Sequence, residues 1–428
     1  MTEGALQRAA ADWIMQAALD GTDMPELLDG AAKRALANGI PLSRAHVTYR
    51  TLHPAFESVS VMWRRETGVH VQEFAHGTAL HSSWSRSPFA YLVGNDIAFM
   101  RRPLAGEGKL IDFAVLEDLK QEGGTDYFAM VIGFDSQEIA ISGNRPDGIA
   151  TSWATDRPGG FTDTHIEDLQ HLIRRLAVAC KLAIREQIAR NVASTYLGES
   201  AGRQVLSGHI KRGDYETIDA VVWGADLRDS TGRTERLGME RYLSLLNGFL
   251  ECAAGAVQAF DGEILAYPGD GVLAIFRAED PSAAACAAIS ATAEFRRRLY
   301  DVNENLSEVG AEPMRAGLGI HRGDLAFGNI GTGGRQAFTA IGPAVNAVNR
   351  LESLTKSFSY PVILSDAVAN LLPADTLPLV PLGEQSVRGS EHPLTLYGAA
   401  DDDLLRYNAP EGYSEVVLSP IPAAADLS

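Results

Sequence analysis

The spacing of hydrophobic residues changes several times along the 428-residue chain, and each change marks a new region. Over residues 4–37 apolar side chains recur every three or four positions, which predicts helix with a break near Gly21 and Pro25. Short apolar or alternating runs between turn signals then predict strands. These strands cover residues 46–49, 58–63, 70–74, 127–134 and 148–155. We therefore expect residues 40–161 to form an α/β module of about a hundred residues, an ordinary domain size.

A long helix is predicted next, because Thr164 and Glu167 form a capping box at its start. Its apolar positions alternate in spacings of four and three: Leu169, Ile173, Leu176, Cys180 and Ala183, extended by Ile188 and Val192. This pattern fits a coiled-coil-like seam with the same helix of a second chain, and it fits equally an amphipathic helix lying on its own domain. The position of the helix between two domains favours the paired form.

From residue 218 to 400 strands and helices mix without regular βαβ order, which predicts an α+β sandwich of helices on a sheet. A strand ends at Asp226, a helix follows over about 234–260, and a hairpin carries Asp270 at its tip. Further elements are expected at 281–303 (helix), at 314–320, 325–330 and 336–341 (strands), and around Asn346 and Arg350 (helix). The expected divisions are a helical segment (1–39), a sensor domain (40–161), a linker helix and transducing segment (162–217), this third domain (218–400) and a loose tail (401–428).

Composition narrows the class of protein. Apolar content of 46% and charged content of 21% are those of a folded globular chain. A formal net charge of −18 argues against a general nucleic-acid binder, which must neutralise phosphates. The scattered Cys180, Cys252 and Cys286 have neither metal nor disulfide spacing, so we expect packing residues. With no signal pattern and no apolar run of about 20 residues, the sequence predicts a cytoplasmic protein without a membrane span.

Asp226 and Asp270 each stand where an apolar strand ends. Taken singly, neither predicts a site. Asp270-Gly271 between two apolar runs is a common hairpin signal, and Asp226 would ordinarily cap a helix or face solvent.

Their combination with later stretches resembles the class III nucleotidyl cyclases, the catalytic domain of adenylate and guanylate cyclases. The likeness runs from Ala220 to about Ala399, with motifs in the family's order. Residues 226–231 and 269–271 resemble its two metal-binding stretches. The other similar stretches are 319–323 with 328–331 (glycine-rich hairpin), 341–353 (transition-state helix) and 387–398 (closing strand). More loosely, residues 40–161 resemble a GAF domain, through the strand at 149–154, residues 160–163 and the exit helix.

The resemblance implies a site for two Mg²⁺ or Mn²⁺ ions, held by Asp226, Asp270 and the Leu227 carbonyl. Oxygen donors suit both metals. It also implies that Asn346 and Arg350, four apart on one helix face, orient the ribose and stabilise the α-phosphate in the transition state. The remaining substrate contacts that it implies are Thr231, Gly269, Ala266, Thr339, Arg335 and Arg388. Arg335 and Arg388 would equally be solvated surface arginines.

The implied enzyme is an adenylate cyclase that makes 3′,5′-cyclic AMP at sites shared by a homodimer, under an unknown small-molecule or protein signal. Base recognition departs from the family pattern. Adenylate cyclases usually have Lys where this chain has Ala266, which can neither donate nor accept a hydrogen bond, whereas the Thr339 hydroxyl can do both. Pro268 is also unusual. GTP or relaxed specificity, and a catalytically silent nucleotide-binding regulator, therefore remain alternatives.

Aromatic residues in the sensor region have two interpretations. They either line a small-molecule pocket or form plain core. They are Trp63, Trp84, Phe89, Tyr91, Phe99 and Phe128.

Overall fold

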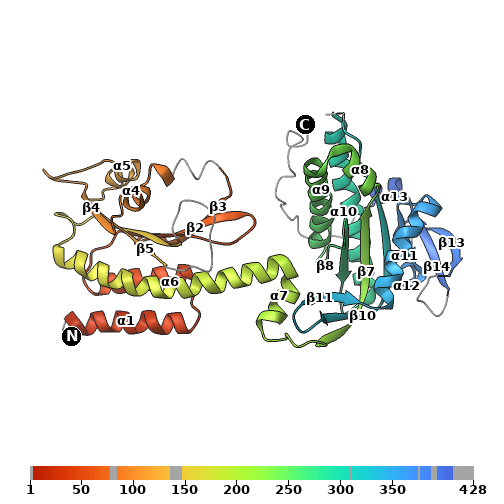
Figure 1. Cartoon of the computed structure of the whole chain (residues 1–428), viewed down its shortest axis with the longest axis horizontal. Helices are drawn as coiled ribbons and strands as arrows, with labels where there is room; N and C mark the ends of the chain where they lie inside the picture. Colours follow the sequence, from red (N-terminus) through yellow and green to blue (C-terminus); the bar gives the residue numbers. More distant parts are fainter. Residues whose placement is uncertain are drawn as a thin grey trace. The chain divides into compact units, whose positions relative to one another are not determined.

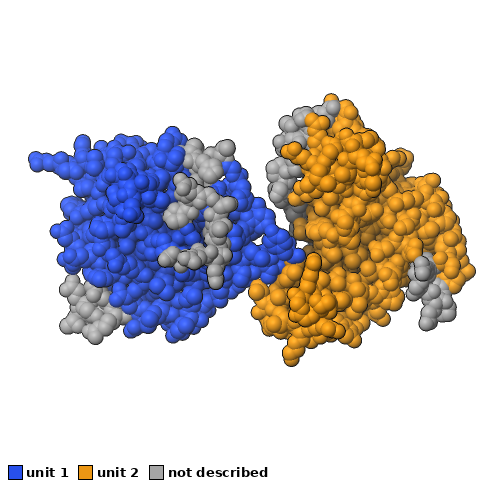
Figure 2. All heavy atoms as spheres, in the orientation of Figure 1, with its two compact units in different colours: residues 1–196 blue, residues 197–428 orange. Residues whose placement is uncertain are grey.

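The structure is a computed structural model that describes residues 3–77, 84–134, 147–308, 310–374, 376–386 and 393–407. The chain divides into two compact units, residues 1–196 and 197–428, coloured blue and orange in Figure 2. Each unit has a hydrophobic core of its own. In the described ranges, no helix combines the length and the apolar character that crossing a membrane requires.

Unit 1 is built on an antiparallel sheet, whose six described strands run in the order β3-β2-β1-β6-β5-β4. The strands are β1 (Arg44–Arg50), β2 (Phe56–Arg64), β3 (Gly68–Ala75), β4 (Phe99–Pro103), β5 (Asp126–Gly133) and β6 (Gly148–Thr155). All five strands predicted here are confirmed. The hydrophobic pattern did not predict β4, a short strand that contains two arginines and a proline. Because every strand pair is antiparallel, the unit is α+β, and the α/β prediction for it is wrong. The GAF-like resemblance stays a prediction.

Helices cover both faces of this sheet (Figure 1). On one face lie α1 (Glu3–Leu19), α2 (Met24–Ala37) and α6 (Asp163–Leu197), and on the other α4 (Pro88–Gly94) and α5 (Ala114–Gln121). Alternation along β1 sends Ala45, Val47 and Tyr49 into the core with α2 and α6. The break between α1 and α2 falls where Gly21 and Pro25 predict it, and these helices pack on the sheet of unit 1.

Helix α6 buries most of the stripe that the sequence predicts as a possible seam between two chains, whereas Val192, at its end, is exposed. Leu169, Ile173 and Leu176 are each 0% exposed, in one core with the sheet, α1 and α2. The stripe therefore holds α6 on its own unit, and the prediction of pairing through these residues is wrong. A different set on α6 is exposed, including Val178 and Leu182.

Unit 2 contains an eight-stranded sheet in the order β13-β14-β12-β10-β7-β9-β8, with β11 paired to β10. The strands are β7 (Tyr215–Leu227), β8 (Glu263–Ala266), β9 (Gly271–Phe276), β10 (Ala316–Gly331), β11 (Gln336–Ile341), β12 (Val362–Ser365), β13 (Val380–Gln385) and β14 (Leu394–Ala399). β10 is one continuous strand where the sequence predicts two. Gly323 and Asp324 look like a turn, but they pair with Ala220 and Asp219 of β7.

The helices of unit 2 lie on both faces of its sheet, as the predicted sandwich requires (Figure 1). They are α7 (Glu199–Leu206), α8 (Ser230–Leu237), α9 (Met239–Ala259), α10 (Pro281–Glu308), α11 (Pro343–Phe358), α12 (Asp366–Ala369) and α13 (Asp401–Arg406). Alternate residues of β7 face opposite layers: Val221 and Trp223 pack with α9 and α10, whereas Ala220 and Val222 pack with α11. The helix predicted over 234–260 is two helices, separated at Gly238, which has a φ of +76°.

The start of the predicted loose tail is ordered structure. Residues 401–406 form α13, and Leu404 and Tyr407 are buried in the main core of unit 2. The prediction of looseness is therefore wrong for 401–407. Residues 408–428 lie outside the described part of the chain.

Candidate active site

The structure brings Asp226 and Asp270 together at one end of the sheet. Asp226 lies near the end of β7, where it pairs in register with Gly271, the residue after Asp270. The Leu227 amide donates a hydrogen bond to the Asp270 carbonyl oxygen over 3.4 Å. Backbone pairing of β7 with β9 thus sets two carboxylates side by side, although they are 44 positions apart in the sequence.

Gly271 makes room for this arrangement. A Cβ atom at this position would lie 2.8 Å from the Ala225 carbonyl oxygen and 3.1 Å from Asp226 Oδ1. Any side chain here would push against the strand that presents Asp226. The Asp-Gly pair is therefore a turn signal and also a condition for the position of the neighbouring carboxylate, which the sequence alone does not distinguish.

The carboxylate pair carries excess negative charge. Partial burial, followed by the charges of Asp270 and Glu352, raises the pKa of Asp226 to about 6. Lys356 and Arg228 oppose this shift without cancelling it. A divalent cation would relieve such repulsion, and carboxylate and carbonyl oxygens are the donors that Mg²⁺ and Mn²⁺ prefer.

The residues present therefore fit the metal ions that the sequence implies. No cluster of three or more Asp, Glu, His or Cys residues with metal-binding geometry occurs in the described ranges. Backbone oxygen, such as the Leu227 carbonyl, and substrate oxygen would have to complete the ligand set around Asp226 and Asp270.

An ion pair that no sequence motif indicates joins the loop after Asp226 to α11. Arg228 Nη1 lies 2.8 Å from Glu352 Oε1, with both side chains largely buried. Arg228 also donates to the Thr355 hydroxyl. Gly317 permits this crossing, since a Cβ there would lie 1.8 Å from Arg228 Nη2. The partners are 124 positions apart, so sequence spacing gives no sign of the pair.

Helix α11 lies flat on the sheet because two register partners lack side chains. Gly224 of β7 pairs with Gly319 of β10. A Cβ at Gly224 would come within 2.5 Å of Val348 Cγ1, and one at Gly319 within 2.4 Å of the Val348 carbonyl oxygen. Gly319, predicted as part of a glycine-rich hairpin, thus acts in packing the helix.

This seating fixes which face of α11 reaches solvent. The buried face includes Val348 and Glu352, whereas Asn346 and Arg350 are exposed. The α11 charges that shift the pKa of Asp226 are those of Glu352 and Lys356. The structure therefore groups the carboxylate pair with Glu352 and leaves Asn346 and Arg350 together on the outer face of the helix.

Comparison with known proteins gives a family for this arrangement. The adenylate cyclase of Anabaena cylindrica is 27% identical over 191 residues, which cover 44% of this chain and 38% of that protein. Adenylate cyclase 1 of Rhizobium meliloti (strain 1021) is 31% identical over 203 residues, 46% of this chain and 30% of that protein. The chain contains a class III nucleotidyl cyclase domain. It spans less than two-fifths of the length of either of these relatives.

Solved cyclase structures match a similar share of the chain. The adenylyl cyclase CyaB from P. aeruginosa aligns at 25% identity with a TM-score of 0.40, over 44% of this chain and 96% of its own. The guanylyl cyclase Cya2 aligns at 23% identity with a TM-score of 0.40, over 47% of this chain and 99% of its own. No family model matches the sequence.

The two base-reading candidates of the cyclase domain lie on neighbouring strands. Ala266 is the last residue of β8, Thr339 lies on β11, and these two strands contact each other. Both residues are half-buried. A site that reads the base here has one hydroxyl from Thr339 and none from Ala266.

The remaining substrate candidates of the cyclase domain stand at element ends. Thr231 is exposed in the first turn of α8, and Gly269 lies in the turn between β8 and β9 with a φ of +66°. Arg335 is exposed in the turn between β10 and β11. Arg388 lies outside the described residues.

Proposed function

We propose that the protein is an adenylate cyclase, which converts ATP to 3′,5′-cyclic AMP and pyrophosphate at the interface of a homodimer. The observation that carries the proposal is the adjacent pair Asp226 and Asp270, where partial burial and then the charge of Asp270 raise the pKa of Asp226 to about 6. The names of the two bacterial relatives support the choice of reaction.

In this reaction the ribose 3′ oxygen attacks the α-phosphorus in line with the departing pyrophosphate. A new oxygen–phosphorus bond forms at the 3′ position, the bond to the bridging oxygen of pyrophosphate breaks, and the hydroxyl proton leaves to solvent. Two divalent ions, when bound, would neutralise the charge that develops in this step. Asp226, Asp270 and the Leu227 carbonyl would hold these ions.

The exposed pair on α11 would act on the other side of the nucleotide. The Arg350 guanidinium presents several N–H groups in a fixed plane, which suits the oxygens of an α-phosphate that gains charge in the transition state. Asn346, one turn earlier, would hold the ribose so that its 3′ oxygen faces the phosphorus.

Two copies of the chain would complete each site. Asn346 and Arg350 lie on the outer face of α11, whereas Asp226 is influenced by Glu352 and Lys356 of that helix. In a two-fold dimer the same surface patches of both chains meet, so two equivalent sites would form, each with a carboxylate pair from one chain and an Asn/Arg pair from the other.

A direct assay tests the reaction. Purified full-length protein is incubated with Mn²⁺ and either ATP or GTP, and the 3′,5′-cyclic product is measured, with Asp270→Ala as the control variant. We expect cyclic AMP from the wild type and a loss of product in Asp270→Ala. Absence of product from both nucleotides, with folded dimer present, would instead support the nucleotide-binding regulator.

The comparison of ATP with GTP also tests base selectivity, because Ala266 offers no hydrogen bond to the base. A site that loses a base-reading partner loses much of its selectivity. Equal rates with ATP and GTP would indicate a relaxed cyclase, and a higher rate with GTP would indicate a guanylate cyclase. Ala266→Lys should then shift the preference toward ATP.

A further inference from the structure

Unit 1 contains a cavity of about 380 Å³ on the face of its sheet opposite α1, α2 and α6. This volume falls in the range of small-molecule sites, roughly 300–1,000 Å³. Strands β1, β2, β3 and β6 and helix α4 contribute to its lining. Part of the lining is apolar and aromatic, with Met62, Phe74, Trp84, Phe89 and Val93.

The aromatic residues of unit 1 had two interpretations, pocket lining or plain core, and the structure assigns different residues to each. Trp84 and Phe89 line it, with ring centroids 6.4 Å apart. Trp63 and Phe128 are buried in the core on the α6 side. Tyr91 and Phe99 are exposed, at 41% and 44%. The pocket interpretation therefore fits Trp84 and Phe89, and plain packing accounts for Trp63 and Phe128.

Two arginines of β1, Arg44 and Arg50, line the same cavity, because even-numbered positions of this strand face it. Arg50 has Glu57 as an ion-pair partner at 3.6 Å. No Asp or Glu is among the described residues that line the cavity. The described lining of the cavity thus carries a net positive charge.

Arg44 is the buried charge that lacks a carboxylate of its own. Its residue is 6% exposed, and burial lowers the pKa of its guanidinium. Its hydrogen bond among the described residues goes to the Ser152 hydroxyl, over 3.2 Å. Glu122, the carboxylate that acts on it electrostatically, is paired with Arg64 at 2.7 Å. A buried cation is costly unless an opposite charge pairs with it.

His46 stands between this charge and the aromatic rings. Burial, followed by the charge of Arg44, lowers the pKa of His46 to about 3, so the ring is neutral at physiological pH. Its centroid lies 5.9 Å from that of Phe89, with the planes 26° apart. His46, Phe89 and Trp84 therefore offer flat surfaces beside Arg44 without adding charge.

We propose that this cavity binds a small organic anion, with a flat apolar body against His46, Phe89 and Trp84 and a carboxylate or phosphate group on Arg44. Charge-assisted hydrogen bonds from a guanidinium to such groups are among the strongest in proteins. The ligand would supply the charge that the buried Arg44 lacks.

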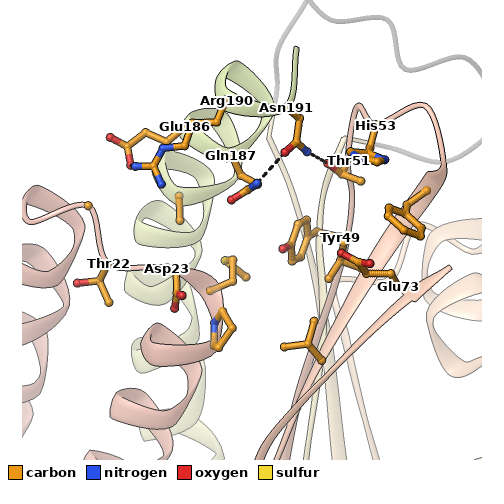
Figure 3. A pocket seen from close by; sticks show the side chains of 17 residues that line it. Thr22, Asp23, Tyr49, Thr51, His53, Glu73, Glu186, Gln187, Arg190 and Asn191 are labelled. Atoms are coloured by element: carbon orange, nitrogen blue, oxygen red, sulfur yellow. Dashed lines mark hydrogen bonds and ion pairs between the residues drawn. The ribbon is translucent and has the colours of Figure 1, made fainter. Parts of the chain in front are cut away.

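A second cavity of unit 1 sharpens the assignment by contrast (Figure 3). It has a volume of about 280 Å³ and lies on the α6 side of the sheet. Asp23, Glu73 and Glu186 line it, and Arg190 is paired with Glu186 at 3.5 Å. Its carboxylates would repel an anion. Arg44 also borders a third cavity, of about 260 Å³, which Glu66, Glu122 and Asp156 line as well, so Val93→Phe, which changes only the first cavity, locates the binding.

Calorimetric titration of the full-length protein tests the proposal with three probes that share a phenyl ring. Phenylacetate and phenyl phosphate carry the anion, and phenylacetamide is the uncharged match of phenylacetate. We expect saturable binding of at least one anion. The amide should bind at least about tenfold more weakly than that anion, because it lacks the charge-assisted hydrogen bond. The better anion identifies the head group as carboxylate or phosphate.

Variants locate the binding. Arg44→Gln should weaken the anion about tenfold or more, and Val93→Phe should weaken it by filling the cavity. Arg102→Gln is the matched control, since Arg102 belongs to the same sheet and pairs with Asp112 at 3.0 Å but does not line the cavity. The affinity of this variant for the anion should stay unchanged. If Arg44→Gln does not fold, Val93→Phe and the acid–amide pair decide. Equal binding of acid and amide, unchanged affinity in Arg44→Gln or in Val93→Phe, or no binding of either anion would overturn the proposal.

Discussion

Asp226 is the residue whose ionisation sets the charge of the candidate site. Its pKa of about 6 in the folded chain exceeds the ordinary value of about 4. A raised carboxyl pKa means that the folded state binds the proton more tightly than the unfolded state does. Stability contributed by this group is therefore lost as pH rises from about 4 through about 6, and the charged form destabilises the metal-free protein above that range.

Replacing Asp226 with Asn should therefore stabilise the metal-free protein at pH 8. We expect a gain in the free energy of unfolding of about 1–2 kcal/mol. This gain is smaller than the whole pKa shift of Asp226 converted at ~1.4 kcal/mol for each pKa unit, because the side chain is partly solvated. The measurement is thermal unfolding in a chelator at several pH values. The gain should shrink as pH falls from 6 to 4, and added Mn²⁺ should raise the melting temperature of the wild type only.

Asp229→Asn is the control in the same loop, because Arg236 lowers the pKa of Asp229 and the residue is exposed. Its replacement should give no gain at pH 8. An Asp226→Asn protein less stable than wild type at pH 8, or a gain that does not vary with pH, would show that repulsion does not act on Asp226.

Gly271 offers a second test at the residue scale. Gly271→Ala should displace Asp226, because the added Cβ would lie 3.1 Å from its Oδ1 and 2.8 Å from the Ala225 carbonyl oxygen. A misplacement of about 1 Å can cost ~100-fold in rate, so we expect cyclase activity to fall by that order. Gly248→Ala in α9 is the control, since nothing lies within 4 Å of the added atom. Full activity in Gly271→Ala would contradict the assigned position of Asp226.

At the scale of elements, helix α6 has two stripes of residues, and in both of them the residues follow one another at steps of three and four positions. Leu169, Ile173 and Leu176 are buried in unit 1. A second stripe of alternating four- and three-residue steps is turned outward: Val178, Leu182, Arg185, Ala189, Val192 and Tyr196. Four of these side chains are exposed apolar groups, at 63%, 49%, 41% and 80% for Val178, Leu182, Val192 and Tyr196. Since the proposed reaction needs two copies of the chain, the outer stripe is the one available for pairing α6 with itself.

Leu182→Glu and Ile173→Glu should consequently have different effects, the first on dimerisation and the second on folding. Leu182→Glu should weaken the dimer and lower activity at low protein concentration, with unit 1 folded. Ile173→Glu should unfold unit 1, because it places a charge in a core position that is 0% exposed. Sedimentation velocity and circular dichroism separate the two effects. A Leu182→Glu protein that dimerises as tightly as wild type would remove the outer stripe from the interface.

At the scale of the whole molecule, the shared site makes a prediction that no single-chain site makes. Asp270→Ala and Arg350→Ala proteins should each be inactive, and mixing them should restore activity. In a two-fold dimer half of a random equal mixture is heterodimer, and each heterodimer has one intact site, so we expect about a quarter of wild-type activity.

The mixture needs time for subunits to exchange, so activity is followed until it is constant. The control mixes Asp270→Ala with Asp226→Ala, whose defects lie in the same half of the site and which should stay inactive together. If Asp270→Ala and Arg350→Ala gave no activity when mixed, although each bound a wild-type partner, the site would lie within one chain.

The sequence by itself determined the elements with strong local signals, and it predicted the residues of the site. Alternation and turn residues predicted five strands of unit 1, and the break between α1 and α2 falls where Gly21 and Pro25 predict it. The motifs from 226 to 353 predicted Asp226, Asp270, Asn346 and Arg350 as site residues, because a cyclase resemblance depends on the order of motifs along the chain.

The tertiary structure decided what depends on contacts between distant residues. Gly323 and Asp324 are strand residues because β7 pairs with them, although locally they resemble a turn. Which stripe of α6 is buried depends on the face that packs on the sheet, because both stripes have the same period in the sequence. The pair of Arg228 with Glu352, and the unpaired charge of Arg44 facing a cavity, arise only after folding, because spacing along a chain carries no information on which groups share a buried space.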